Sequence, residues 1–268
     1  DQNPGTKEEP FRHIQKYADI AQPGDVCFVR EGVYRETVRP KNSGQSGDPI
    51  LYVAYPGEKV TLSGTEPVEG KWTKYKGSIY QIKLDVECRQ LFVDGEMMIE
   101  ARWPNMRMDQ IWERSCWAAS DVGSVYGKMV DADLAETDVD WTGAIATLNI
   151  AHQFSTWTRR VTKHEKGSDY FEYPKDFGKL SGTIGHSSAF EDDFYYLSGK
   201  LGALDIPTEW FYDEETQTLY LWAPDGKNPE KHRVEVKVRD RGFEVKDRDE
   251  IHLIGFNFIV KNRFAMRW

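Results

Sequence analysis

Flat aromatic rings lie beside hydrogen-bonding side chains in two short stretches of the sequence. Arg102-Trp103-Pro104-Asn105 combines a guanidinium, an indole and an amide, and residues 151–160 interleave rings with a histidine and arginines. Such rings stack on the apolar face of a pyranose, while amide and guanidinium groups bond its hydroxyls. The alternative is that these rings pack a junction between domains. We predict the following sugar-binding residues: Arg102, Trp103, Asn105, Trp117, His152 and Trp157.

Carboxylates are numerous, but none is assigned a catalytic role. Cleavage of a glycosidic bond needs two Asp or Glu side chains across the sugar, about 5 Å apart for retention or about 6.5–9.5 Å apart for inversion. The available residues include Glu191, Asp192, Asp193, Asp205, Glu209, Asp247, Asp249 and Glu250. Turn and surface roles are the commoner use of such residues, so the catalytic residues remain unassigned. One alternative places the chemistry near Asp192 and Asp249.

Neither a metal nor a cofactor is expected. The sequence contains no HExxH, no phosphate-binding glycine-rich loop, no GxSxG and no set of histidines at metal-ligand spacing. Its three cysteines, Cys27, Cys88 and Cys116, are widely spaced and predict neither a zinc site nor a disulfide framework. We expect Cys27 to be a small buried hydrophobic residue in a strand.

Composition excludes some classes of partner. The formal net charge of −9, without a cluster of Lys and Arg, argues against nucleic acid and mildly against a strongly acidic polymer. No apolar run is long enough to span a bilayer, so no membrane partner is expected. The first residue is Asp rather than Met, so either a leader has been removed or the sequence is a trimmed piece of a longer chain. On the first alternative we expect the protein to be secreted or periplasmic.

A repeat near the start of the chain indicates which elements would position these residues. Two β-branched and aromatic runs separated by a Glu-Gly corner recur after about 24 residues, so that Cys27 matches Leu51 and Val38 matches Leu62. Strands this short cannot bury a core alone and must stack, which predicts an all-β protein built on a parallel β-helix. An amphipathic helix over 10–21 is expected to cap the open edge.

The period is lost after Gly64 and resumes at Arg233. Between them, alternating strand patterns and turns such as Asp94-Gly95 predict an inserted antiparallel β-sandwich. The predicted domains are a lead and capping helix at 1–22, the first β-helix coils at 23–68, the insert at 69–232 and resumed coils at 233–268. Alternation along the strands predicts that these side chains point into the core: Val26, Phe28, Val38, Leu51, Val53, Leu62, Val236, Val245, Leu253 and Phe258.

Several stretches together carry a family resemblance. They are Gln22-Pro23-Gly24-Asp25, Glu31-Gly32-Val33-Tyr34-Arg35-Glu36, Phe92-Val93-Asp94-Gly95 with Ala101–Asn105, and Leu204–Asp213 with Leu219–Trp222. With these residues the chain resembles right-handed parallel β-helix proteins of the pectate-lyase-like superfamily. Among them it is similar to β-helical glycoside hydrolases with an inserted β-sandwich, a group that includes β-xylosidases, xylanases and fucosidases. Thr208 departs from the pattern, because the family usually has Gly there, and it suggests an altered turn.

The resemblance implies a carbohydrate-active protein, the N-terminal part of a glycoside hydrolase acting on a plant or algal polysaccharide or oligosaccharide. In that family the catalytic carboxylates come from coils that follow the insert. We therefore expect them beyond Trp268, in a longer protein or in a second chain that completes the β-helix. The alternatives are a polysaccharide lyase, which would need a basic residue to abstract a proton, and a non-catalytic glycan-binding or structural protein.

Overall fold

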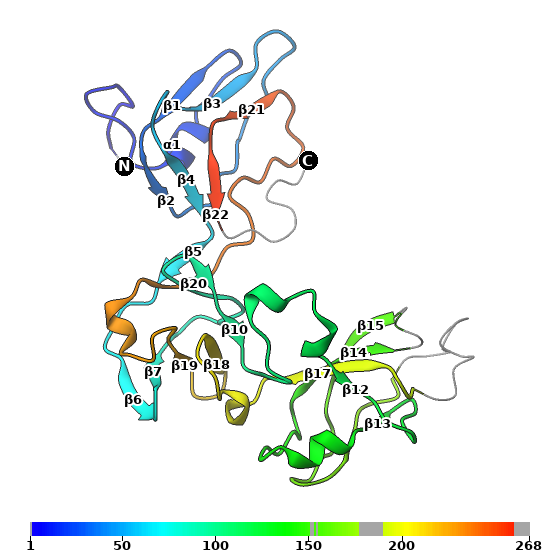
Figure 1. The fold of residues 1–268 in the computed structure, drawn as a ribbon. Coiled ribbons are helices and arrows are strands. Elements are labelled where there is room, and N and C mark those ends of the chain that lie inside the picture. Colours follow the sequence, from blue (N-terminus) through cyan, green and yellow to red (C-terminus); the bar gives the residue numbers. More distant parts are fainter. Residues whose placement is uncertain (1, 151–152, 154, 177–189, 260–268) are drawn as a thin grey trace. The chain divides into compact units, whose positions relative to one another are not determined.

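The chain divides into two compact units. A computed structural model describes residues 2–150, 153, 155–176 and 190–259 (Figure 1). Unit 1 comprises Asp1–Pro67 and Glu235–Trp268, and unit 2 comprises Val68–Val234. No helix in the described ranges is long and apolar enough to cross a membrane.

Unit 1 is built around two three-stranded parallel sheets. Their orders are β1-β3-β21 and β2-β4-β22. The elements of this part of the chain are α1 (Ile14–Ala18), β1 (Val26–Val29), β2 (Gly32–Tyr34), β3 (Ile50–Ala54), β4 (Val60–Ser63), β5 (Thr65–Pro67), β20 (Val234–Lys237), β21 (Ile251–Ile254) and β22 (Asn257–Ile259). The two runs recognised as a repeat pair in parallel, with Val26 opposite Leu51 and Gly32 opposite Val60. β-Branched and aromatic residues favour such pleated, half-buried surfaces.

The core of unit 1 uses the opposite faces of β1 and β3 from those predicted. Ile50 and Tyr52 are fully buried, whereas Val26 is 44% and Phe28 is 57% exposed. The Tyr52 ring lies edge-on to Tyr17 and to Phe243, with centroids 5.2 and 5.1 Å away. Since side chains alternate along a strand, an error of one residue turns the whole set to the other face. The predicted core positions Val38, Leu62, Val236 and Val245 are buried, and the following are half-buried: Leu51, Val53, Leu253 and Phe258.

The N-terminal helix is shorter than predicted. α1 has five residues, and His13 before it is extended. The free N–H groups of Ile14 and Gln15 both donate to the Glu36 carboxylate at 3.0 Å. A carboxylate at a helix N-terminus satisfies donors that have no partner within the helix. The helix therefore starts at Ile14, where its first N–H groups can donate to Glu36, and not at Pro10.

Unit 2 consists mainly of antiparallel hairpins. One sheet has the order β10-β18-β19-β7-β6, a second has the order β11-β17-β14-β15 with β12 also on β17, β13 pairs with β16, and β8 pairs with β9. Its strands are β6 (Thr73–Lys76), β7 (Ile79–Lys83), β8 (Leu91–Val93), β9 (Glu96–Met97), β10 (Ile99–Glu100), β11 (Arg102–Trp103), β12 (Ala118–Ala119), β13 (Lys128–Val130), β14 (Ile145–Ile150), β15 (Ser155–Arg160), β16 (Tyr170–Glu172), β17 (Phe194–Ser198), β18 (Glu209–Asp213) and β19 (Thr218–Trp222). Short 3-10 helices are η1 (Met108–Gln110), η2 (Arg114–Cys116), η3 (Ala132–Glu136), η4 (Leu201–Ala203) and η5 (Pro229–Lys231).

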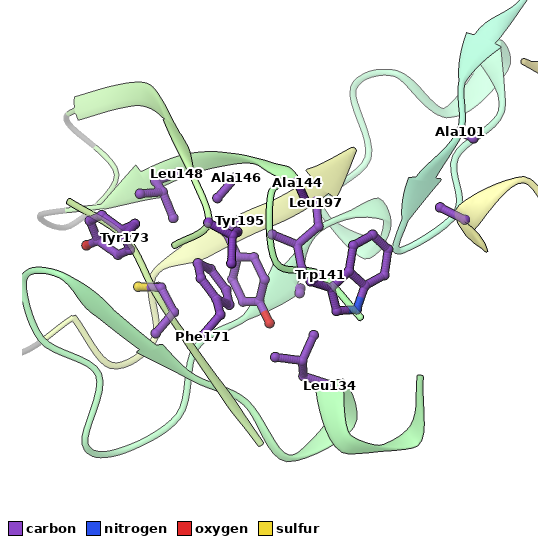
Figure 2. Close-up of a cluster of buried hydrophobic side chains, with 14 of the residues drawn as sticks. Ala101, Leu134, Trp141, Ala144, Ala146, Leu148, Phe171, Tyr173, Tyr195 and Leu197 are labelled. Atoms are coloured by element: carbon purple, nitrogen blue, oxygen red, sulfur yellow. The ribbon is translucent and has the colours of Figure 1, made fainter. Parts of the chain in front are cut away.

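A cluster of aromatic and aliphatic side chains forms the core of unit 2 (Figure 2). Phe171 and Tyr195 lie side by side, with ring centroids 5.2 Å apart, and Trp141 and Leu134 lie near them. The Tyr195 hydroxyl donates to the Asp131 carboxylate at 2.7 Å, so the one polar atom of this ring is satisfied. Burial of such large rings supplies much of the hydrophobic stabilisation of a domain.

The predicted parallel β-helix with a capping helix and an inserted β-sandwich is wrong. Over the described ranges the strands form six separate small sheets, mostly antiparallel, and no solenoid is found. Parallel pairing is extensive only in the two three-stranded sheets of unit 1. From Val68 to Val234 most strands pair in hairpin fashion, because tight turns such as Asp94-Gly95, with φ of 53° and 90°, return the chain beside the preceding strand.

Candidate functional site

Two cavities in unit 2 share one residue, Glu100. The larger, which we name the β18 cleft, has a volume of about 570 Å³. It is lined by the end of β18, the start of β14, the end of β15 and the following residues: Glu100, Gly143, Ile145, Arg160, Gly199, Lys200, Leu201, Gly202, Phe211, Tyr212, Asp213, Glu214 and Glu215. The smaller, the Arg102 cavity, has a volume of about 200 Å³ and is lined by Arg102, Met106 and Tyr196 among others.

Strand length explains why the β18 cleft exists. β10 has only two residues, and it pairs in parallel with the start of β18, with Ile99 opposite Glu209 and Glu100 opposite Trp210. Among the described strands none continues beside Phe211–Asp213 on that edge. The chain leaves β10 at Ala101, whose N–H donates to the Trp210 carbonyl at 2.7 Å. The free edge of β18 therefore becomes one wall of the cleft.

The cations of the β18 cleft bond carbonyl groups and leave donors for a ligand. Arg160 donates through one terminal nitrogen to the Gly143 carbonyl at 2.7 Å, and the Lys200 ammonium donates to the Thr142 carbonyl at 2.9 Å. A guanidinium has five N–H groups and an ammonium has three. Both side chains can thus donate further hydrogen bonds within the cleft.

Two carboxyl groups of the β18 cleft have pKa values shifted in opposite directions. Desolvation by the cleft walls raises the pKa of Glu100 above its ordinary value. Burial would also raise the pKa of Asp213, but hydrogen bonds from Thr216 and from the N–H of Glu215 outweigh it and lower that pKa. The N–H donors of Glu215 and Thr216 lie 3.0 and 3.2 Å from Asp213 Oδ1. The shift of the Glu100 pKa is thus toward the protonated form, and that of the Asp213 pKa is toward the ionised form.

Arg102 holds the loop that follows it. Its side chain is buried, donates to the carbonyls of Pro104 and Cys116, and stacks 3.7 Å from the centroid of the Tyr196 ring. Burial lowers the pKa of Arg102, and its side chain makes no salt bridge within the residues that the structure describes. The loop that it holds displays Trp112, which is 91% exposed.

Glu209 is a fully buried carboxyl group at the start of β18. The N–H of Asp205 donates to Glu209 Oε2 at 3.2 Å, while Glu209 Oε1 has no good hydrogen-bond partner in the described part of the chain. Burial raises the pKa of Glu209 to about 8, which nearby backbone N–H groups only partly offset. Glu209 is consequently protonated in the folded chain at neutral pH.

The structure separates the residues that the sequence grouped as a sugar-binding set. Arg102 and Trp117 meet at Tyr196, and the Trp117 ring lies 4.9 Å from the Tyr196 ring. Trp103 packs against the core rings of Trp141 and Tyr195, at 6.5 and 6.1 Å.

The other members of that set lie elsewhere. Asn105 is exposed and donates to the Asp205 carboxylate at 2.9 Å. Trp157 lies on β15 opposite Leu148 and packs against the same core as Trp103. His152 lies outside the described residues. Of the five that the structure describes, Arg102 alone lines either cavity.

Sequence reasoning missed the residues that line the β18 cleft. Glu100 directly follows the apolar run Met97-Met98-Ile99. A carboxylate at the end of such a run is a sequence signal that could have indicated a site residue. Arg160, Lys200 and Asp213 carry no local signal, because they are brought together by strands far apart in the sequence. No group of three or more His, Cys, Asp or Glu side chains arranged for a metal ion was found in the described ranges.

Comparison with known proteins identifies the fold. No family model matches the chain. An "Uncharacterized protein YwoF" of Bacillus subtilis (strain 168) is 45% identical over 64 residues, which are 24% of this chain and 14% of that protein. A solved structure described as "Glycoside hydrolase" matches 96% of this chain and 48% of its own, with a TM-score of 0.71 and 18% identity. The chain shares its fold with a glycoside hydrolase.

A second solved structure with this glycoside-hydrolase-like fold is of XylC in complex with xylose. It matches 96% of this chain and 33% of its own, with a TM-score of 0.51 and 18% identity. The chain therefore spans about half or less of the structures that it resembles, and 14% of its Bacillus relative. At this level of identity the likeness concerns the fold.

Proposed function

We propose that the chain is a carbohydrate-active protein, part of a glycoside hydrolase acting on a plant or algal polysaccharide or oligosaccharide, and that its β18 cleft binds the sugar. The observation that carries the proposal is a polar cleft of about 570 Å³ in a chain whose fold matches both a glycoside hydrolase and the xylose complex of XylC. Ligand sites of small molecules have volumes of about 300–1,000 Å³. Since polysaccharides of this kind lie outside cells, we also propose that the protein is secreted or periplasmic.

The groups in the β18 cleft suit a neutral sugar. Arg160 and Lys200 offer donors to hydroxyl oxygens, and the carboxylates of Asp213, Glu214 and Glu215 accept hydrogen bonds from hydroxyl groups. Phe211 and Tyr212 add apolar surface for a ring face. Because carboxylates outnumber cations here, a uronate polymer would be repelled, and this disfavours the lyase alternative.

Titration of the chain with sugars tests the proposal. We expect xylobiose and xylotriose to bind with a Kd near the millimolar range, about −4 kcal/mol, in isothermal calorimetry or by NMR, and galacturonate oligomers to bind more weakly. Arg160→Ala and Lys200→Ala should weaken binding, whereas Lys74→Ala on the exposed strand β6 is the matched control. Equal binding by all three variants would place the sugar elsewhere.

Hydrolysis within the β18 cleft itself is a second candidate. The opposite pKa shifts of Glu100 and Asp213 are those of a general acid and a carboxylate base or nucleophile. If the catalytic carboxylates lie outside this chain, as the family resemblance implies, the purified 268-residue protein should bind sugar without releasing reducing ends. If it does release them, Glu100→Gln and Asp213→Asn should abolish turnover and retain binding. Turnover that survives both substitutions would exclude this pair.

A further inference from the structure

Unit 1 contains an apolar cavity that the glycan proposal does not use. It has a volume of about 420 Å³, and five of its lining residues are aromatic: Phe11, Tyr17, Phe28, Tyr34 and Tyr55. Phe28 lies 57% exposed on β1, and its ring meets that of Tyr55 edge-to-face at 6.1 Å. Exposed apolar surface gathered around a cavity is typical of a binding site for an apolar ligand. We name it the Phe28 pocket.

The charged side chains that line the Phe28 pocket are basic, although Glu36 lies 3.9 Å from His13 and Glu58 pairs with Arg30 just outside the lining. Its lining includes Lys7, His13 and Arg30 and no Asp or Glu, although the protein as a whole has a net charge of −9. Arg30 is fixed at the rim by Glu58, at 2.6 Å, and lies 4.7 Å from the centroid of the Tyr55 ring. Lys7 is exposed. A basic rim above apolar walls complements a ligand with an anionic end.

The walls of the pocket disfavour a sugar as its ligand. Tyr17, which is 8% exposed, lines the pocket next to Cys27, together with the other aromatic residues. A sugar would leave many hydroxyls unpaired against these apolar walls.

We propose that the Phe28 pocket binds an aromatic carboxylate. The flat ring lies among Phe28, Phe11 and Tyr34, and the carboxylate lies at the rim with Lys7 and Arg30. Edge-to-face packing of the kind already present between Phe28 and Tyr55 holds the ring. The proposal does not depend on sugar binding, because all residues of the pocket belong to unit 1 and the β18 cleft belongs to unit 2.

Protection of Cys27 from alkylation provides the test. Cys27 is partly exposed, while Cys88 and Cys116 are buried, so iodoacetamide should modify Cys27 first. Burial raises the pKa of Cys27 to about 11, and the reaction is therefore followed at about pH 9. The probe is 3-phenylpropionate. Its controls are 3-phenylpropanamide, which has the ring without the charge, and hexanoate, which has the charge without the ring.

The result expected is protection by the aromatic carboxylate alone. At about four times its Kd, 3-phenylpropionate should slow alkylation about fivefold, while each control slows it less than about twofold. Phe28→Ser should remove the protection, and Val33→Ser is the matched control, because Val33 is 59% exposed on β2 and does not line the pocket. Absence of protection, or equal protection by the amide or by hexanoate, would overturn the proposal.

Discussion

The two units of the chain differ in how their buried charged groups are satisfied, although exposed ion pairs occur in both. In unit 1 cations pair with carboxylates, as Arg30 does with Glu58 and Arg35 with Glu235, each at 2.6 Å. In unit 2 a fully buried carboxyl group, Glu209, bonds backbone N–H, and a buried guanidinium, Arg102, bonds carbonyls and a ring. Neither makes a salt bridge in the described part of the chain.

This difference between the units indicates that the electrostatically unfavourable groups lie in unit 2. An exposed ion pair such as Arg30–Glu58 contributes little to stability, and in the largely buried pair Arg35–Glu235 each charge has a partner. Buried groups with shifted pKa values lower stability unless a function uses them, and they gather at binding and catalytic sites. In unit 2 burial raises the pKa of Glu209, and on the neighbouring strand desolvation raises the pKa of Glu100, an exposed residue that lines both cavities. We therefore expect the stability of unit 1 to depend mainly on apolar packing, and that of unit 2 to depend on pH through its buried ionisable groups.

The largest effect is expected from a charge in the core of unit 1. Ile50→Asp buries an unpaired carboxylate at a position that is fully buried, and should lower the free energy of unfolding by more than about 4 kcal/mol. Urea unfolding followed by circular dichroism, with hydrogen exchange of residues 2–67, measures it. Leu51→Asp is the matched control, because Leu51 is half-buried on the other face of β3 and should tolerate the change better. Equal losses would refute the observed register.

Positions 50 and 51 also show how much of the fold could be predicted from the sequence. The repeat of about 24 residues was sufficient to predict that the repeated runs lie beside each other, but its register was one residue off, because Leu51 lies opposite Val26 and not opposite Cys27. It could not tell which face is buried, because β1 and β3 carry apolar residues on both faces. The solenoid was an extrapolation from few repeats. Non-local strand pairing, which decides between stacked coils and separate sheets, leaves no mark in a short repeat.

For the site, sequence reasoning predicted Arg102, which holds the loop that follows it, and missed the residues of the β18 cleft. Arg102 was predicted because it lies beside a ring and an amide, and it does line a cavity. Glu100 and Asp213 meet in one cleft only because β10 is short and leaves part of β18 uncovered. Strand ends depend on tertiary context more than on local propensity, so this arrangement was outside the reach of pattern reading.

Glu209 should make the stability of unit 2 depend on pH. Its pKa rises from an ordinary value of 4.5 to about 8, so the folded state retains a proton that the unfolded state loses. The free energy of unfolding should therefore fall by about 1.4 kcal/mol per pH unit between pH 4.5 and pH 8. Glu209→Gln should remove this slope, so that the variant exceeds the parent at pH 8. Urea unfolding at several pH values measures it, with Glu214→Gln, an exposed position, as control.

Parallel stability curves for Glu209→Gln and the parent would show that the carboxyl group is not desolvated. In that case Arg102 and Glu100 would be the remaining evidence that unit 2 contains desolvated ionisable groups.

A smaller gain is expected from relieving backbone strain beside Glu209. Thr208 has φ of 76°, a left-handed conformation that a β-branched residue rarely adopts. Its N–H bonds the Trp222 carbonyl and its carbonyl accepts from Ile99, and Gly retains both. Thr208→Gly should raise stability by about 1 kcal/mol, or the Tm by about 2–4 °C. Gln217→Gly, at φ of 50° without a branched side chain, should gain less. A loss on Thr208→Gly would mean that the side chain stabilises the turn.

The smallest effect is expected at His232, a histidine of unit 2 that lies between two carboxylates. His232 Nδ1 lies 2.7 Å from Asp94 and Nε2 lies 3.1 Å from Asp225. The hydrogen bond to Asp94, opposed by burial and helped by Asp225, raises the pKa of His232 above 6.5. Since a raised histidine pKa stabilises the protonated folded state, this contribution is fully present below pH 6.5 and disappears as the pH rises through the folded pKa. His232→Gln should lower stability at pH 6 by less than about 1 kcal/mol, since solvent screens the pair, and the deficit should vanish by pH 9. Thermal unfolding at both pH values measures the difference in stability. A deficit that persists at pH 9 would show that the ring stabilises unit 2 by packing and not by its charge.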